Sequence, residues 1–259
     1  MGQPAVSALA PLPFELVYDD GEPLETEWHT WEYPLLRELI RQAMAEQGRT
    51  DFYTGGNMFV YYSVEQAREV WEEEEKGRRP KRAFRGPDVF WVGGVDPDRK
   101  RKAWVSWEED GRLPDVIVEL LSPKTAKNDR TKKKEIYQNA FRTAEYFLYD
   151  PDSGQLEGFR LLHGSYRPVR PDRKGLLRSE RLGVSVGLWR GVVKKRKDTW
   201  VRLFRPDGTP VPTSDEQAET ERLRADEECQ RAETERLRAD AAETELARLR
   251  ALLREQGGG

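Results

Sequence analysis

Two short apolar runs, each beginning with a proline and an aspartate, carry the clearest pattern in the chain. Residues 113–123 read LPDVIVELLSP, and residues 86–94 read GPDVFWVGG. Runs of β-branched and other apolar residues between turn-forming prolines and glycines predict short strands, and the first run is typical of a strand buried on both faces. The two runs therefore predict two core strands of a sheet.

Up to residue 205 the chain alternates between helical and strand periodicity, which predicts an α/β fold with a mixed sheet flanked by helices. An apolar stripe predicts a helix over residues 30–48, with Pro34 tolerated in its first turn. Glycine and asparagine at 55–57 predict a hairpin turn between strands 52–54 and 58–62. Further expected elements are a short helix at 64–71, strands at 144–149, 156–162 and 166–169, and a hairpin at 192–204.

The composition changes from residue 206 onward, where a turn and prolines precede a long charged stretch. This stretch repeats AETERLRAD at 218–226 and 232–240, a shift of two heptads. Alanine and then leucine hold one heptad position, which favours a marginal coiled coil that joins copies of the chain through its last two turns; Glu and Arg pairs could instead support a lone helix. The expected parts are a flexible arm (1–13), a folded domain (14–205), a linker (206–213) and a charged helix (214–256).

Composition narrows the classes of function. The net charge is −3, so no global basic excess indicates nucleic acid, although local basic runs remain. With Cys229 as the single cysteine and two histidines, a disulfide framework and a zinc site are disfavoured, and a reducing cytoplasm is expected. We expect no signal peptide and no membrane span, because no apolar run approaches the roughly 20 residues required.

Glu119, in the middle of the 113–123 run, is the residue that most needs an explanation. An uncompensated buried carboxylate costs several kcal/mol unless a cation meets it. In the helix that follows, which Asp129 can cap, the apolar residues within 136–141 define one buried face, and Lys133 falls near its centre. The simplest arrangement places Lys133 beside Glu119, and a lysine that snorkels out to solvent is the alternative.

Asp88 begins the 86–94 strand, so we expect it on a strand next to that of Glu119. Hard divalent cations such as magnesium bind carboxylate oxygens, lower the pKa of a bound water and stabilise charge on a phosphate. With Lys133 to orient or deprotonate that water, the implied chemistry is hydrolysis of a phosphodiester. Asp115 also follows a proline and shares a strand face with Glu119; a turn-forming role is the more ordinary interpretation, and a supporting contact near the metal stays open.

The order of these motifs resembles the Uma-type restriction endonuclease family of the PD-(D/E)XK nucleases. The resemblance rests on GPDVFWV, RKAWVSWEEDGRLPDVIVELLSP, KTAKNDRTKKKEIYQNAFRTAEYFLYDP and LEGFRL, and covers residues 14 to about 215. It implies a restriction-endonuclease-like fold in which Asp88 and Glu119 are metal ligands. Leu121 stands where the parent pattern has its lysine.

The Uma-type family is similar in carrying its lysine on the next helix, in an Asp-x-x-x-Lys-x-x-x-Tyr frame. Asp129, Lys133 and Tyr137 match that frame, and the helical periodicity reaches Lys133 independently. Lys134 and Lys124 remain alternatives for the catalytic lysine.

These observations predict a magnesium- or manganese-dependent endonuclease that hydrolyses DNA. The alternative is an inactive DNA-binding or assembly protein in which Glu119 and Lys133 form only a structural salt bridge. Basic runs at 78–85 and 99–102 are expected to form part of a phosphate-binding rim. Expected DNA contacts are Lys124, Lys127, Arg130, Lys132 and Lys134. Supporting residues are Asp115, Asp129 and Tyr137, and weak candidates from the first helix are Glu32 and Glu38, whereas His29 is expected to be a capping or surface residue.

Overall fold

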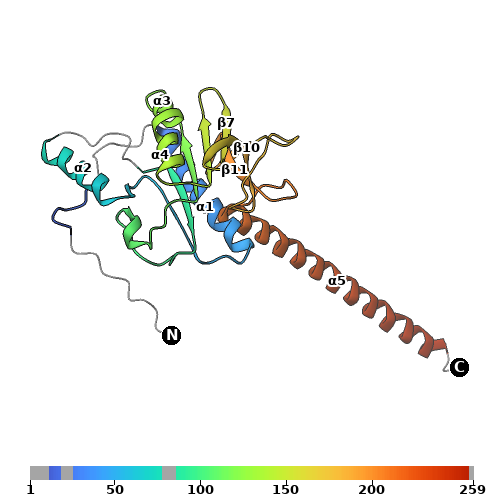
Figure 1. Ribbon diagram of the computed structural model, residues 1–259. Helices are drawn as coiled ribbons and strands as arrows, with labels where there is room; N and C mark the ends of the chain where they lie inside the picture. The colour runs from blue at the N-terminus through green and yellow to red at the C-terminus, as the bar shows by residue number, and fades with distance from the viewer. Residues whose placement is uncertain (1–11, 19–25, 78–85, 257–259) are drawn as a thin grey trace. The chain divides into compact units, whose positions relative to one another are not determined.

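A computed structural model of the protein describes residues 12–18, 26–77 and 86–256, and the chain divides between Val211 and Pro212 into two compact units (Figure 1). The first unit contains a six-stranded sheet in the order β1-β3-β5-β6-β7-β8. In this sheet β5 and β6 run parallel, and the other neighbouring strands run antiparallel. The strands are β1 (Phe52–Gly55), β3 (Val89–Gly93), β5 (Val116–Leu120), β6 (Glu145–Asp150), β7 (Gln155–Leu162) and β8 (Ser165–Pro168).

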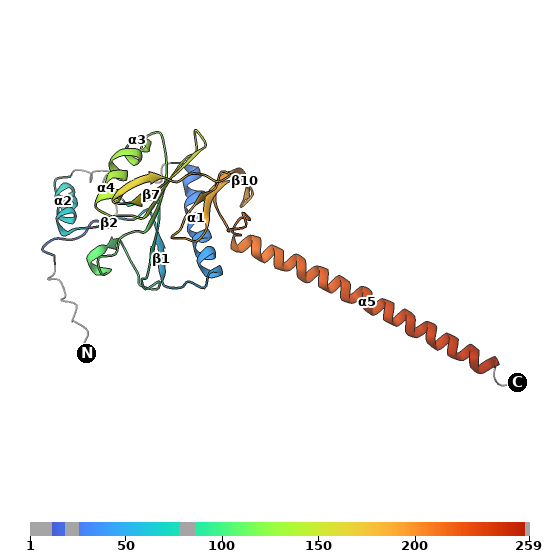
Figure 2. The ribbon, with the colours of Figure 1, turned by 45° about the vertical axis from the view of Figure 1, so that its right-hand side comes forward.

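Each face of this sheet is covered by a different layer (Figures 1 and 2). The long helix α1 (Glu27–Glu46) packs on one face together with a smaller sheet, ordered β11-β10-β9. The helix α4 (Lys134–Asn139) packs on the other face. The smaller sheet consists of β9 (Leu177–Arg178), β10 (Ser185–Val193) and β11 (Arg196–Phe204).

Strand β5 contributes alternate residues to the two layers, as its period of two requires. Val118 and Leu120 pack with the α1 layer, whereas Ile117 and Leu121 pack with the α4 layer. All five residues of β5 are buried. The predicted α/β fold, with a mixed sheet flanked by helices and a helical tail, is therefore confirmed.

The predicted hairpin around residues 55–57 is wrong. Strand β1 pairs with β3, whereas β2 (Val60–Tyr61) pairs in parallel with β4 (Trp104–Val105). Gly56 allows the backbone of Asp88 to pass close to it, because a Cβ atom at position 56 would lie 2.0 Å from the backbone oxygen of Asp88. After β2, the helix α2 (Val64–Glu75) begins at Ser63, whose side chain accepts a hydrogen bond from the Gln66 amide.

The predicted linker, residues 206–213, is shorter than expected. Val211 is buried in the core, and its amide donates to the Leu203 carbonyl at 2.8 Å, so the chain folds back along β11. Only then does α5 (Ser214–Gln256) begin. Thr213 and Glu216 exchange hydrogen bonds as a capping box, with the Thr213 amide donating to Glu216 at 2.8 Å and the Glu216 amide to Thr213 at 3.2 Å.

Helix α5 is strongly charged, and its leucines at 223, 237, 246 and 249 are exposed. None of the helices in the described part of the chain combines the length and the apolar character that crossing a membrane demands.

Candidate active site

Glu119 lies on β5 with its whole side chain buried on the α4 side of the sheet. Its Oε1 atom accepts two hydrogen bonds, one from Lys133 Nζ at 3.0 Å and one from the Tyr137 hydroxyl at 2.8 Å. Lys133 is itself only 7% exposed, so its ammonium does not snorkel out to solvent. The structure thus brings the buried carboxylate and the inward lysine together.

The lysine comes from a helix that contains a π-helical turn. Helix α3 (Ala126–Asn128) continues through the π-helical η3 (Asp129–Lys133) into α4. Single π-helical turns inside α-helices are frequent at functional sites. The helix begins three residues before Asp129, so the prediction that Asp129 caps its start is wrong.

Asp129 instead lies inside the helix and is buried. Its Oδ1 atom forms an ion pair with Lys133 Nζ at 3.0 Å, and its backbone oxygen accepts from the Tyr146 hydroxyl at 3.1 Å. Asp129, Lys133 and Tyr137 follow one another at intervals of four, so all three face β5. The Lys133 ammonium is therefore held between two carboxylates.

This arrangement shifts the protonation equilibria of its members. Burial raises the pKa of the Glu119 carboxyl well above its ordinary value, the nearby acids raise it further, and the Lys133 ammonium opposes the shift. Burial alone would lower the pKa of Lys133, but Glu119 and Asp129 outweigh that effect and raise it. Burial also raises the pKa of Tyr137, followed by the effect of Glu119. Lys133 and Tyr137 therefore keep their protons and act as hydrogen-bond donors.

Asp88 immediately precedes β3 and lies beside the end of β5. Its Oδ2 atom accepts a hydrogen bond from the Leu120 amide at 2.7 Å, and its own amide lies 3.4 Å from Glu119 Oε2. Asp88 is partly exposed, and its Oδ1 atom has no hydrogen-bond partner among the described residues. Asp88 and Glu119 therefore present two neighbouring carboxylates at one end of the sheet.

The donor set of this pair suits a hard cation. Within the described ranges, no group of three or more His, Cys, Asp or Glu side chains is arranged to hold a metal ion. Magnesium does not require such a group, because it is commonly bound by one or two carboxylates together with waters and substrate phosphates. Asp88 and Glu119 fit that mode of binding.

The expectation that His29 is a capping or surface residue is wrong. His29 is buried in the first turn of α1, where its Nε2 atom lies 2.9 Å from the Leu120 carbonyl and its Nδ1 atom 2.7 Å from Thr26 Oγ1. The Leu120 peptide groups are thus held by His29 on one side and Asp88 on the other. A signal for this burial was present, because His29 precedes the apolar Leu36 by seven residues, two helical turns.

Of the three other predicted acids, Asp115 and Glu32 lie away from this cluster. Asp115 accepts a hydrogen bond from the Gly93 amide at 3.0 Å, at the opposite end of β3 from Asp88, and so joins the start of β5 to the end of β3. Glu32 is buried against the smaller sheet, where it accepts from the Val201 amide at 3.2 Å. Glu38 is half-buried on α1.

The basic residues of the helix divide into two groups. Lys127 and Lys132 are exposed and form no ion pair within the described ranges, and Lys124 is exposed as well. Arg130 instead pairs with Glu157 of β7 at 2.7 Å. Lys134 is half-buried, with its ammonium 3.2 Å from the centre of the Phe159 ring. The last two side chains therefore fasten the helix to β7.

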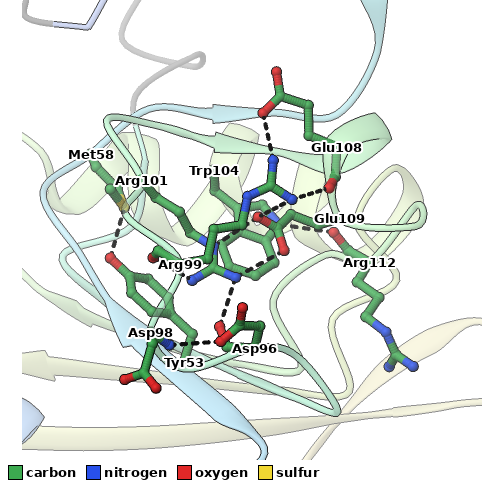
Figure 3. Close-up of polar contacts among 10 residues, drawn as sticks. All are labelled: Tyr53, Met58, Asp96, Asp98, Arg99, Arg101, Trp104, Glu108, Glu109 and Arg112. Atoms are coloured by element: carbon green, nitrogen blue, oxygen red, sulfur yellow. Dashed lines mark hydrogen bonds and ion pairs between the residues drawn. The ribbon is translucent and has the colours of Figure 1, made fainter. Parts of the chain in front are cut away.

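The predicted basic rim is not supported around residues 99–102. This segment follows the end of β3 that is remote from Asp88, and Figure 3 shows its contacts. The Arg101 guanidinium packs against both the Tyr53 and the Trp104 ring, 4.6 and 5.0 Å from their centres, and forms an ion pair with Glu109 at 2.8 Å. Its buried side chain fastens the loop to Glu109, the residue that follows the 3-10 turn η2 (Ser106–Glu108). The other basic run, 78–85, lies outside the described residues.

A comparison with models of known protein families shows to which family the chain belongs. The family model of Uma2, described as "Putative restriction endonuclease", matches residues 13–193. The chain belongs to this family. The Uma2 match includes Asp88, Glu119 and Lys133 and confirms the resemblance drawn from the order of the motifs, although it ends before β11.

A solved structure similar to this Uma2 chain is described as a "putative nuclease belonging to DUF820 from Anabaena variabilis ATCC 29413". The two share 14% sequence identity with a TM-score of 0.42, over 64% of this chain and 81% of the other. A search of the curated proteins found no relative.

Proposed function

We propose that this Uma2 chain is a metal-dependent endonuclease that hydrolyses phosphodiester bonds in DNA. The observation that carries the proposal is the convergence of Asp88, Glu119 and Lys133, which come from three different elements, at one end of the sheet. A structural salt bridge alone would not need the partly exposed Asp88 beside it. Membership of the family supports the same class of reaction.

Asp88 and Glu119 would hold the ion, magnesium or manganese. Such an ion supplies a bound water of lowered pKa and neutralises charge on the phosphate. Asp88 is kept in place through the Leu120 amide, and Glu119 through Lys133 and Tyr137. The chain's own hydrogen bonds therefore orient both carboxylates before any ligand arrives.

Lys133 contributes a donor at the same place. An ammonium has three N–H groups; one donates to Glu119, and Asp129 forms an ion pair with the same ammonium at 3.0 Å. An N–H group that does not donate to Glu119 can donate to the attacking water or to a phosphate oxygen. Because the two carboxylates favour the charged form, we assign Lys133 to positioning and charge stabilisation rather than to proton abstraction.

The exposed lysines Lys124, Lys127 and Lys132 are proposed to contact the DNA backbone, since they lie on the segment that carries Lys133 into the site. Phosphate contacts of this kind orient a protein on DNA without reading its sequence. Arg130 and Lys134 support them indirectly, by fixing the helix to β7.

The test is nicking of supercoiled plasmid with magnesium or manganese. We expect Asp88→Asn, Glu119→Gln and Lys133→Met each to lower the rate by about 100-fold or more. Glu135→Gln, an exposed acid on α4, is the matched control and should cleave like the wild type. If the wild type binds DNA but leaves it intact with every metal, the inactive DNA-binding alternative replaces the nuclease.

We also propose that α5 joins copies of the chain through its C-terminal turns, where Leu246 and Leu249 are exposed three residues apart on one helical face. Light scattering should give a multiple of 30.1 kDa for the wild type. Leu246→Glu with Leu249→Glu should reduce the mass to one chain, whereas Leu223→Glu with Leu237→Glu should not. A wild type of single-chain mass rejects this proposal.

A further inference from the structure

The β10–β11 hairpin ends in a tight basic turn. Val193 pairs with Arg196, so Lys194 and Lys195 form a two-residue loop. Their φ angles, 45° and 71°, are both positive, as a type I′ turn requires. Asparagine and glycine are the residues favoured in such turns. The hairpin thus carries two lysines at positions where their backbone conformation is uncommon.

We define the basic tip as Lys194, Lys195 and Lys197. All three side chains are exposed, and none forms an ion pair within the part of the chain that the structure describes. The nearest acids are already engaged, because Arg196 binds Glu27 at 3.1 Å and Asp198 at 3.3 Å. The basic tip therefore presents three positive charges to solvent.

The first turn of α1 relates the basic tip to the candidate active site. Glu27 binds Arg196 at the base of the tip, and His29, two residues later, contacts the Leu120 carbonyl beside Glu119. An α-helix with its side chains is about 10–12 Å across. The tip and the end of β5 therefore lie on two sides of a single helical turn, at the same end of the molecule.

The basic tip and the helix lysines lie on opposite faces of the sheet. Glu119 is covered by the helix that carries Lys127 and Lys132, in the α4 layer. The hairpin belongs to the α1 layer, since Trp200 and Val201 of β11 pack in the core of that face. The end of β5, with the two carboxylates, lies between these two basic groups.

We propose that the basic tip is a second phosphate-binding arm, which contacts one backbone of duplex DNA while Lys127 and Lys132 contact the other. This inference rests on the proposed nuclease function, because it places the scissile bond between the two contacts. A duplex offers two backbones, one on each side of a groove, and two basic groups on opposite faces of one sheet can each contact one of them. Single-stranded DNA has one backbone and would therefore contact only one of the two basic groups.

The experiment measures DNA binding by fluorescence anisotropy, with the full chain, in EDTA so that no cleavage occurs. The variant carries Lys194→Gln, Lys195→Gln and Lys197→Gln. The control carries Lys100→Gln, Arg142→Gln and Arg181→Gln, three exposed cations away from the site that remove the same charge. The probes are a 20-base-pair duplex and a single strand of equal length.

We expect the tip variant to bind the duplex about tenfold more weakly than the control variant, and the slope of log K against log salt to fall by about 0.9 for each lost contact. The loss should be smaller with the single strand. Equal duplex binding by the two variants overturns the proposal, and so does an equal loss with both probes.

Plasmid cleavage separates this inference from the proposed function. If the wild type does not cleave but the tip variant still loses duplex affinity, the nuclease proposal fails and the binding arm stands. If the wild type cleaves and the tip variant binds and cleaves as the control does, the arm fails and the nuclease stands.

Discussion

Lys133 Nζ and Glu119 Oε1 lie 3.0 Å apart, although the two residues are 14 positions apart in the sequence and belong to a helix and a strand. Both side chains are almost completely buried. The pair accounts for a charge in the middle of an apolar strand, and it places a cation directly beside a candidate metal ligand.

Replacing Lys133 by Met should destabilise the fold. The change leaves Glu119 and Asp129 buried without their cation, which costs roughly 3–5 kcal/mol when one partner of a buried ion pair is removed. Urea unfolding measures the loss. Adding Glu119→Gln to the same chain should recover part of the lost stability, because one of the two buried carboxylates is then replaced by a neutral amide. If the losses of the two single substitutions simply add in the double variant, Glu119 and Lys133 are not energetically coupled.

Asp88→Asn should separate metal binding from folding. Asparagine keeps an oxygen that can accept the Leu120 amide, so the melting temperature should change little. The carboxylate charge is lost, so manganese affinity measured by calorimetry should fall by about tenfold or more. Unchanged manganese affinity would remove Asp88 from the site.

His29→Leu should weaken metal binding although His29 touches neither carboxylate. The substitution removes the contact between His29 and the carbonyl of Leu120, the residue whose amide donates to Asp88. Removing a residue that supports a metal ligand typically lowers metal affinity by about 10-fold or more. His29→Gln keeps a donor and should restore most of the affinity. Gln47→Leu is the control, because Gln47 makes a similar contact with the Leu182 carbonyl near the other end of α1.

Glu32 should make stability depend on pH. Burial raises its pKa well above the ordinary value, only partly opposed by the Val201 amide and Arg202. The folded state therefore favours the protonated form of Glu32. The contribution of this carboxyl to the free energy of unfolding is fully present below the unfolded-state pKa of about 4.3, and it is lost as the pH rises through the folded-state pKa. Glu32→Gln cannot ionise, so its stability relative to the wild type should increase from pH 4.5 to pH 8 in urea titrations. A difference that stays flat would show that Glu32 is not perturbed.

The Arg101 ion pair should be a stabilising contact with no part in DNA binding. Arg101→Leu leaves Glu109 with only the longer ion pair to Arg99 at 3.5 Å and should cost roughly 1–3 kcal/mol. Lys100→Leu, next to it and exposed, should change the free energy of unfolding by less than about 0.5 kcal/mol. DNA affinity of the folded Arg101 variant should equal that of the wild type.

The features that sequence periodicity could predict are local. A charge inside a β-branched run marks Glu119, and the 3.6-residue period of the following helix places Lys133 inward. Each argument needs fewer than twenty consecutive residues. The core strands β3 and β5 were predictable for the same reason.

The features that could not be predicted depend on partners distant in the sequence. Strand β1 pairs with β3 instead of the nearby β2, because Gly56 allows the backbone of Asp88 to pass against it. His29 finds its partner 91 positions away, and the Arg101 side chain packs against two aromatic rings, those of Tyr53 and Trp104. Neither the periodicity nor the secondary-structure propensity of a sequence predicts such long-range contacts.

The π-helical turn at Asp129–Lys133 imposes a fixed spacing on the chain. Asp129 and Lys133 form their ion pair across a spacing of four residues, so deleting one residue between them would change that spacing. Length changes in this turn are therefore far less tolerable than length changes in the exposed β6–β7 turn, where no site residue would be displaced. The site depends on the number of residues in this segment as much as on their identity.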